Sequence, residues 1–183
     1  MNEAFVARMR GCTACSLSEQ RTQVVVGTGD ENARLLIIGE APGRTEDEGG
    51  EPFRGRSGRL LVELLAEIGV TREECFITNV VKCRPPNNRT PTRAEITSCR
   101  PWWEQQLSYF RSSIVLTLGN TATQAVVGHR APMTVSHGVP VTAHGHVIVP
   151  TYHPAAALRG GNSVVAVMRE DLKVVATLLK ESA

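Results

Sequence analysis

Leu35-Leu-Ile-Ile-Gly39 runs directly into Glu40-Ala-Pro-Gly43, so an uninterrupted apolar segment ends in a glycine-rich turn. A short apolar segment of this kind is typical of a strand that is buried on both faces of a sheet. Three more segments read as strands, at 75–81, 113–119 and 147–149. Helical patterns occur at 57–68, from Thr92 through the two tryptophans, at 120–127 and at 163–180. Strands that alternate with helices predict an α/β fold with a mostly parallel sheet and helices on both of its faces.

Length and composition indicate one ordinary domain spanning residues 1–183, with 42% hydrophobic and 21% charged residues. No apolar run approaches the roughly 18 residues that a membrane span needs, so we expect no membrane association. Residues 1–10 contain an early acid and no apolar segment, which argues against a signal peptide. We therefore expect a cytoplasmic protein whose cysteines are kept reduced.

The formal net charge of +2 is too mild to identify a partner, but the charges are unevenly distributed. Between Lys82 and Arg100 five basic residues stand against one acid. Between Glu40 and Glu51 the balance reverses, with five acids against Arg44. The sequence therefore predicts an acidic pocket beside a basic rim.

Four cysteines indicate a metal or iron–sulfur site. Cys12 and Cys15 form a C-x-x-C pair, and Cys83 and Cys99 flank a stretch rich in arginine and proline. In a reducing compartment thiolate ligation is favoured over disulfides, and over four unrelated core thiols. The spacing does not distinguish zinc from a [4Fe–4S] cluster. Cys75, inside an apolar strand, is interpreted as a small buried hydrophobe.

Polar side chains follow the predicted strands, where ligands bind in sheets of this type. We expect the segment Gly39–Gly43, Asn79, Gly119–Asn120 and the segment Tyr152–Pro154 to converge on one crevice. Glu40 is a candidate to position or activate water, although turn glutamates are often simply solvated. Glu46 and Asp47 carry the same ambiguity, and a solvated face is the favoured interpretation for both.

Three further residues each allow a functional and a structural interpretation. Phe53, in a loop rich in glycine and arginine, is either a stacking platform for a planar ring or a core anchor. The amide of Asn79 either reads the Watson–Crick edge of a base or caps a turn. His153, held before Pro154, either donates a hydrogen bond to developing negative charge or is structural.

Several motifs in this order resemble the family 4 uracil-DNA glycosylases, the iron–sulfur branch of that superfamily. They are the paired cysteines, Gly39-Glu-Ala-Pro-Gly-Arg-Thr-Glu-Asp47, Gly50-Glu-Pro-Phe-Arg-Gly-Arg-Ser-Gly58, Thr78-Asn-Val-Val-Lys-Cys-Arg-Pro-Pro86, Cys99-Arg-Pro-Trp102 and His153-Pro-Ala-Ala-Ala-Leu158. Arg54 departs from the family pattern, where an apolar residue is more usual. The resemblance implies a three-layer α/β/α sandwich. It also implies a structural [4Fe–4S] cluster held by Cys12, Cys15, Cys83 and Cys99.

The resemblance also implies an activity, which is hydrolysis of the N-glycosidic bond of uracil in DNA without a metal at the reacting centre. In this family the residue matching Phe53 stacks on the flipped uracil, and the one matching Asn79 reads its edge. Glu40 would orient the water, and His153 would stabilise the departing base. The turn of Ala41, Pro42 and Gly43 would hold the ring, with backbone amides near Ala41 and Gly43 as donors.

On this interpretation the partner is uracil-containing DNA, single- or double-stranded, bound by a monomer associated with the nucleoid. Arg84, Arg89 and Arg93, between two cluster ligands, would follow the phosphates. Neutralising Arg89 and Arg93 should then flatten the salt dependence of DNA binding. Leu158, with Arg159 beside it, is the candidate wedge that fills the gap left by the flipped base.

Two rival interpretations come from other classes of protein. A noncatalytic nucleic-acid-binding module would need only the basic loop between Cys83 and Cys99. A hydrolase of free nucleosides would need no basic loop, and the sequence contains no cradle for a ribose phosphate. The predicted convergence of the polar residues at the strand ends argues against the binding module.

Overall fold

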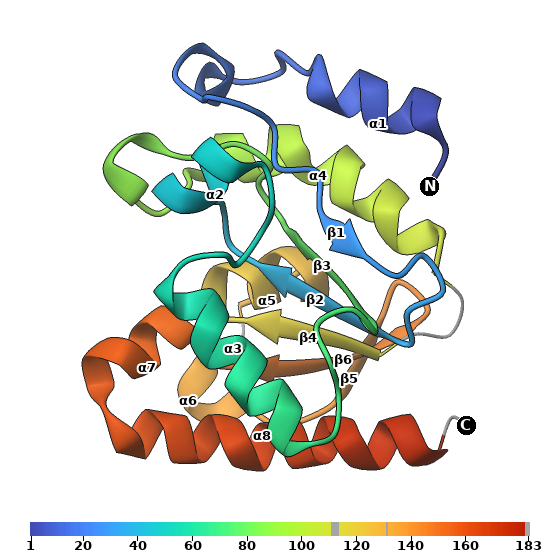
Figure 1. Ribbon diagram of the computed structural model, residues 1–183, viewed down its shortest axis with the longest axis vertical. Coiled ribbons are helices and arrows are strands. Elements are labelled where there is room, and N and C mark those ends of the chain that lie inside the picture. Colours follow the sequence, from blue (N-terminus) through green and yellow to red (C-terminus); the bar gives the residue numbers. More distant parts are fainter. Residues whose placement is uncertain (111–113, 131, 182–183) are drawn as a thin grey trace.

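The computed structural model describes residues 1–110, 114–130 and 132–181. Its centre is a six-stranded sheet in the order β1-β3-β2-β4-β6-β5 (Figure 1). The strands are β1 (Thr28–Gly29), β2 (Leu35–Gly39), β3 (Cys75–Asn79), β4 (Ile114–Leu118), β5 (Val141–Ala143) and β6 (His146–Thr151). β2, β3, β4 and β6 are parallel, and the short edge strands β1 and β5 are antiparallel to their neighbours. The predicted mostly parallel sheet is confirmed, although Ser113 lies outside the described residues.

The helices cover both faces of this sheet. They are α1 (Glu3–Arg10), α2 (Arg44–Gly49), α3 (Arg56–Glu67), α4 (Arg93–Ser108), α5 (Asn120–Val127), α6 (Met133–Ser136), α7 (Pro154–Gly160) and α8 (Asn162–Glu181), with 3₁₀ turns at Ser16–Glu19 and Pro86–Asn88. The four predicted helices correspond to α3, α4, α5 and α8. Among the described residues, no helix is both long and apolar enough to cross a membrane.

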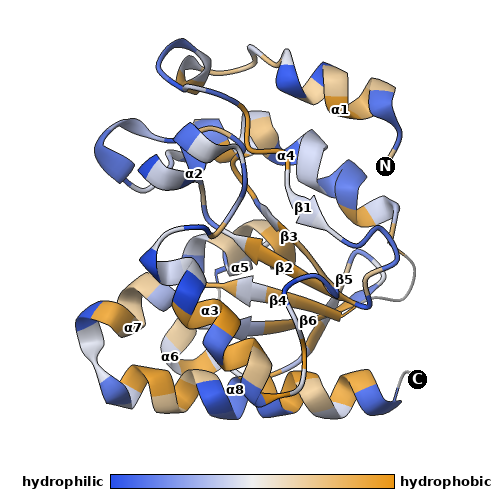
Figure 2. Cartoon of the chain, in the orientation of Figure 1, coloured by the Kyte–Doolittle hydropathy of each residue, from blue (hydrophilic) through white to orange (hydrophobic). Residues whose placement is uncertain are grey.

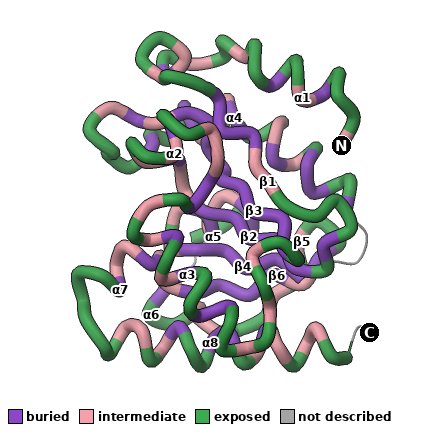
Figure 3. Tube along the Cα trace, in the orientation of Figure 1, coloured by how far each residue is buried: buried purple, intermediate pink, exposed green. Residues whose placement is uncertain are grey.

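Alternate residues of each central strand supply two separate cores, because successive side chains of a strand point to opposite faces. Leu36 and Ile38 of β2 pack with residues of α1, α4 and α5. Leu35 and Ile37 pack with residues of α3 and α8 on the other face. The four central strands are therefore mostly apolar and lie buried between the helices (Figures 2 and 3). This arrangement is the predicted α/β/α sandwich.

Helix α4 begins at a capping box formed by Thr92 and Glu95. The Thr92 hydroxyl accepts a hydrogen bond from the Glu95 amide at 3.3 Å, and the Glu95 carboxylate accepts one from the Thr92 amide at 2.7 Å. Pro101 lies inside α4, which continues past it to Ser108. The helix carries Cys99 to the region between α1 and the sheet.

The register of β2 and β3 fixes the geometry of the strand ends. Gly39 and Asn79 are direct partners across the parallel ladder. Hydrogen bonding continues beyond the strands, from the Val80 amide to the Gly39 carbonyl at 2.9 Å and from the Val81 amide to the Glu40 carbonyl at 3.1 Å. The backbone of Glu40 is therefore held rigidly beside the end of β3.

Candidate functional site

A cleft of about 700 Å³ opens at the carboxyl ends of β2, β3 and β6. Its volume is within the range of pockets that enclose small ligands. The cleft is lined by Glu40, Ala41, Pro42, Gly43, Thr45, Glu46, Phe53, Gly55, Arg56, Ser57, Asn79, Pro85, Asn88, Arg89, Thr90, His153, Ala155 and Arg159. All seven residues that the sequence proposed for substrate binding are therefore brought together. Asn120 has a different role, since its Oδ1 accepts a hydrogen bond from the Met133 amide at 2.9 Å.

Asn79 provides an unused acceptor inside this cleft. The residue is 1% exposed, and its Oδ1 atom has no hydrogen-bond partner among the residues that the structure describes. A Cβ atom at Gly39 would lie 2.4 Å from this oxygen and 2.5 Å from Cζ of Phe53, so only glycine leaves room there. A buried acceptor without a donor is costly, which indicates that a ligand supplies the missing N–H.

Phe53 combines the two roles that the sequence left open. Its side chain belongs to the core cluster with α3 and α8, and it also lines the cleft. Its ring lies 5.7 Å from the His153 ring, at an interplanar angle of 33°. The backbone φ of +53° is unusual for an aromatic residue. The ring is therefore anchored and also available at one edge of the cleft.

His153 precedes α7 as its N-cap residue, and this position fixes its tautomer. Its Nδ1 accepts a hydrogen bond from the Ala155 amide at 3.1 Å, so the proton of the neutral ring is on Nε2. Burial, with a smaller contribution from the charge of Arg159 and against an opposing effect of Glu46, lowers the pKa of His153 to about 4. At neutral pH His153 is therefore an uncharged donor.

Of the acids near the cleft, only Glu40 remains a candidate for water activation. Glu46 accepts hydrogen bonds through Oε1 from the amides of Arg54 at 3.0 Å and Gly55 at 2.8 Å. Its Oε2 accepts one from the Gly43 amide at 3.1 Å, which occupies one of the amides proposed to hold the ring. The carboxylate of Glu46 therefore connects two loops.

Asp47 has a structural role as well. The residue is buried, and its two carboxylate oxygens accept from the Thr22 amide at 3.0 and 3.1 Å. The interpretation of Asp47 as part of a solvated face is therefore wrong. Its carboxylate ties α2 to the segment that follows the first two cysteines.

The basic loop between Cys83 and Cys99 is more internally paired than its composition suggested. Arg84 donates to Asn88 Oδ1 at 2.7 Å. Arg89 forms a bidentate ion pair with Glu95, at 2.8 and 2.6 Å. Hydrogen bonding to Arg89 and Thr92 lowers the pKa of Glu95 to about 2, against an opposing effect of burial. Arg89 thus both lines the cleft and holds the start of α4.

The remaining DNA-contact candidates lie at exposed positions. Arg93 is exposed in the first turn of α4. Leu158 is 41% exposed on α7, and its neighbour Arg159 lines the cleft. Leu158 is therefore exposed next to a residue that lines the cleft, and its role as a wedge stays a prediction.

The four predicted ligands Cys12, Cys15, Cys83 and Cys99 line one small cavity on the other side of the β3 end. Its other walls include Met9, Val24, Val81 and Trp102. Within the described ranges, no group of three or more His, Cys, Asp or Glu side chains is arranged to hold a single metal ion. The structure thus brings the four cysteines from three segments of the chain around one small cavity.

Three N–H groups donate to the cysteine sulfur atoms. They come from the Trp102 indole to Cys12 at 3.2 Å, the Arg21 guanidinium to Cys83 at 3.3 Å and the Lys82 backbone to Cys99 at 3.3 Å. Burial raises the pKa of Cys99 to about 12 and also raises that of Cys83. Thiolates here need a positive centre, and N–H···S hydrogen bonds are typical of iron–sulfur sites. The donor set therefore fits a [4Fe–4S] cluster.

Two polar residues that the sequence analysis did not assign to the site support it from behind. Lys82, counted there toward the basic rim, is instead buried at 1% exposure, and its Nζ donates to the Asn79 carbonyl at 2.7 Å. Arg72 donates to the carbonyls of Pro52 at 2.6 Å and Phe53 at 3.2 Å. The sequence could have indicated a buried Lys82, because this lysine directly follows the apolar pair Val80-Val81. No sequence pattern distinguishes Arg72 from the other arginines.

Comparison with known proteins agrees with this geometry. Residues 26–174 match the model of the uracil DNA glycosylase superfamily. A type-4 uracil-DNA glycosylase of Thermotoga maritima is 41% identical over 98% of this chain and 95% of its own length. One of Sulfurisphaera tokodaii is 40% identical over 91% of this chain and 80% of its own length. A type-5 uracil-DNA glycosylase of Thermus thermophilus is more distant, at 29% over 82% and 85% of the two chains. The chain therefore belongs to the uracil DNA glycosylase superfamily, and within it to the type-4 uracil-DNA glycosylases.

Proposed function

We propose that this protein is a monofunctional glycosylase that hydrolyses the N-glycosidic bond of uracil in DNA, releasing free uracil and leaving an abasic site for base excision repair. Its family membership supports this activity. The observation that carries it furthest is the buried Oδ1 of Asn79, an acceptor without a donor beside the ring of Phe53. A planar base with an N–H on its edge satisfies both groups at once.

Recognition of the flipped base is assigned to three elements of the cleft. Phe53 stacks on the ring, and the amide of Asn79 pairs with the N–H and the adjacent carbonyl of uracil. Pro42 and the backbone amide of Ala41 hold the opposite edge, while the Gly43 amide is already engaged by Glu46. The close packing of Gly39 supports this assignment, because any side chain at residue 39 would collide with both Asn79 and Phe53.

Bond cleavage then needs a water molecule on the sugar and a donor for the departing base. As the glycosidic bond breaks, the sugar gains oxocarbenium character and the electron pair stays on uracil. The Glu40 carboxylate orients the water and accepts its proton. The Nε2–H of neutral His153 donates a hydrogen bond to the uracil oxygen on which negative charge develops, and no proton has to be transferred to the base.

DNA binding is assigned to the basic rim. Arg84, Arg89 and Arg93 neutralise phosphates on one side of the cleft, and Arg159 does so on the other. Leu158 enters the space vacated by the base, which offsets part of the cost of unstacking. Either single- or double-stranded DNA containing uracil meets these requirements.

We also propose that Cys12, Cys15, Cys83 and Cys99 hold a structural [4Fe–4S] cluster. When bound, the cluster supplies a crosslink between the N-terminal segment, the end of β3 and helix α4. The sulfur-directed N–H groups of Trp102, Arg21 and Lys82 support this assignment. The protein as purified should be brown and contain about four iron atoms and four sulfides per chain. Cys99→Ser should lose the colour together with the iron.

The remaining proposals concern the state of the protein in the cell. We infer a monomer whose residues 1–183 form one catalytic domain. Its site of action is the cytoplasm, at the nucleoid, where reduced thiols persist. No helix among the described residues could span a membrane, and this is compatible with the proposal.

The activity is tested with a labelled oligonucleotide that contains one uracil, treated with alkali after incubation to break abasic sites. Cleavage at uracil is expected, and it should fall about 10²- to 10⁴-fold in Glu40→Ala and about 10²- to 10³-fold in His153→Ala. Glu63→Ala and His129→Ala, at exposed positions, serve as matched controls.

Two outcomes would contradict the proposal. Intact DNA with the cluster present would favour the noncatalytic binding module. Cleavage of free deoxyuridine as efficient as cleavage at uracil in the oligonucleotide would favour the nucleoside hydrolase.

A further inference from the structure

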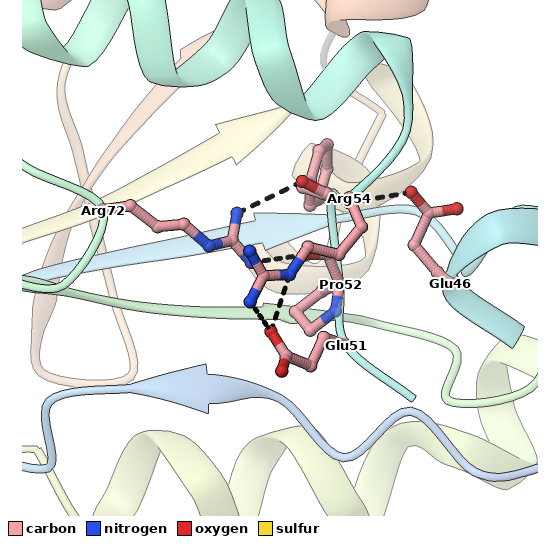
Figure 4. A network of polar contacts seen from close by, with 6 residues as sticks. Glu46, Glu51, Pro52, Arg54 and Arg72 are labelled. Atoms are coloured by element: carbon pink, nitrogen blue, oxygen red, sulfur yellow. Dashed lines mark hydrogen bonds and ion pairs between the residues drawn. The ribbon is translucent and has the colours of Figure 1, made fainter. Parts of the chain in front are cut away.

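The loop that carries Phe53 is held from two sides by ionised side chains (Figure 4). On one side the guanidinium of Arg72 donates to the carbonyls of Pro52 at 2.6 Å and Phe53 at 3.2 Å. On the other side the Glu46 carboxylate accepts from the amides of Arg54 at 3.0 Å and Gly55 at 2.8 Å. The peptide unit between residues 53 and 54 thus has its C=O bound by a cation and its N–H bound by an anion.

The backbone at Phe53 needs such support, because its φ is +53°. The left-handed region is unfavourable for a bulky aromatic residue, and such conformations persist only where the surroundings impose them. Arg72 binds the carbonyls of both peptide units that flank the Phe53 Cα atom, and the relative orientation of these two units sets the direction in which the ring projects. Losing either partner would let the residue relax to negative φ and carry the ring away from the cleft.

The contacts of Arg72 are suited to this task. Its planar fork binds two successive carbonyl oxygens, which a single point charge reproduces less well. The guanidinium is partly buried, and burial lowers its pKa, with a further lowering by Arg54 and an opposing effect of Glu51. Glu51 forms an ion pair with Arg54 and so offsets the second positive charge beside Arg72.

We propose that Arg72 is a positioning residue for uracil excision, which acts by locking the Phe53 peptide in its left-handed conformation so that the ring forms the stacking face of the cleft. This inference rests on the proposed function of the cleft. Arg72 is not among the residues that line the cleft, and its effect on the base passes through Phe53 alone.

The first test measures the loop directly, by hydrogen exchange of the cluster-containing protein over peptides that span residues 50–58. In Arg72→Ala these amides should exchange at least about tenfold faster than in the wild type, with Arg72→Lys intermediate. Arg169→Ala is the matched control, because this arginine is exposed and pairs with Glu67 on the surface. Unchanged exchange in Arg72→Ala overturns the proposal, whatever the activity.

The second test is a double-mutant cycle on kcat/KM for a uracil-containing oligonucleotide. Arg72→Ala should lower kcat/KM about tenfold to a hundredfold in the wild type, the scale of a small misplacement at a reacting centre. In the Phe53→Ala background the same change should cost less than about threefold, since no ring remains to be positioned. Equal losses in both backgrounds overturn the proposal.

Two further comparisons separate this proposal from other effects. If Arg72→Ala unfolds, hydrogen exchange rises over the whole chain. The test then uses Arg72→Lys, in which only the peptides that span residues 50–58 should exchange faster. A wild-type protein that does not cleave uracil overturns the proposed function, whereas the exchange experiment still judges the role of Arg72.

Discussion

The Nζ atom of Lys82 lies 2.7 Å from the backbone carbonyl oxygen of Asn79, in a part of the core that excludes water. The same group donates to Thr78 Oγ1 at 2.6 Å and to Gln106 Oε1. A single buried amine therefore connects the end of β3 to helix α4. The residue proposed to read uracil depends on this connection for its backbone position.

Lys82→Met should lower both stability and activity. Methionine fills a similar volume but removes the Lys82 donor from the Asn79 carbonyl, at a cost of about 1–3 kcal/mol for a buried acceptor. Gln106 Oε1 would keep only the Thr78 hydroxyl, which also donates to the Val26 carbonyl. Urea unfolding and kcat/KM on a uracil-containing oligonucleotide measure the two effects. Lys173→Met, at an exposed lysine paired with Glu170, should change neither. A Lys82→Met protein as stable as the wild type would contradict this account.

Gly39→Ala should lower uracil excision about a hundredfold. The new methyl group would lie within 2.5 Å of both Asn79 Oδ1 and the Phe53 ring, so one of them must move. A displacement of this size at a reacting centre costs about a hundredfold in kcat/KM. In Gly49→Ala, by contrast, the added methyl group meets no atom within 4 Å, and activity should be unchanged. Full activity in Gly39→Ala would show that the base binds elsewhere.

His153 should remain neutral far below the usual range of histidine. Since burial lowers its pKa to about 4, its ring resonances should not shift between pH 8 and about pH 5.5 in an NMR titration. The His153→Asn variant identifies the resonances. Between about pH 6.5 and pH 4 the unfolded chain binds the proton and the folded chain does not, so acidification through this window lowers stability. A titration midpoint near 6.5 would refute the neutral-donor role.

The ion pair between Arg89 and Glu95 should stabilise the protein at neutral pH and lose this effect in acid. The pKa of Glu95 is lowered to about 2, so its contribution is complete above about pH 4.5 and disappears as the pH falls toward 2. Arg89→Gln should therefore be less stable at pH 7 and should lose less stability than the wild type over that acid window. Urea unfolding at several pH values measures this difference. Arg44→Gln, which breaks an exposed pair with Glu48, is the control.

Arg93→Gln should reduce the salt dependence of DNA binding. Each phosphate neutralised contributes about 0.9 to the slope of log K against log salt on duplex DNA, and about 0.7 on single strands. Fluorescence anisotropy at several salt concentrations should therefore give a slope smaller by about this amount. Arg59→Gln, at another exposed arginine, should leave the slope unchanged. An Arg93→Gln slope equal to that of the wild type would remove this residue from the DNA interface.

The central strands and the long helices could be predicted from the sequence, because each carries a periodic pattern that buries many apolar groups. β2 and α3 are examples, with Leu35-Leu-Ile-Ile and the leucines at 61, 64 and 65. The edge strands β1 and β5 could not be predicted, because two or three residues hold no period. Helix α7 is short and begins at His153-Pro154, which local pattern alone reads as a turn.

The site was predictable where a residue lies at or just beyond the carboxyl end of a strand. Glu40, Asn79 and His153 are of this kind, and topology alone brings them to one edge of the sheet. The supporting contacts could not be predicted. The hydrogen bonds of Glu46 and Arg72 to the Phe53 loop join segments that are separate in the sequence, and no sequence pattern links them. The pairing of Arg89 with Glu95 likewise depends on the folded path of the loop.

The direct pairing of Gly39 with Asn79 in the parallel ladder has a consequence for how this enzyme can vary. A one-residue insertion or deletion within β2 or β3 would turn every following side chain to the opposite face and remove the amide from the cleft. The connection from Glu40 to Glu74 is under no such restriction, because its length does not set the register. Natural variants should therefore differ in length between these strands, at positions away from Glu40, Phe53 and Arg72, and almost never within the strands.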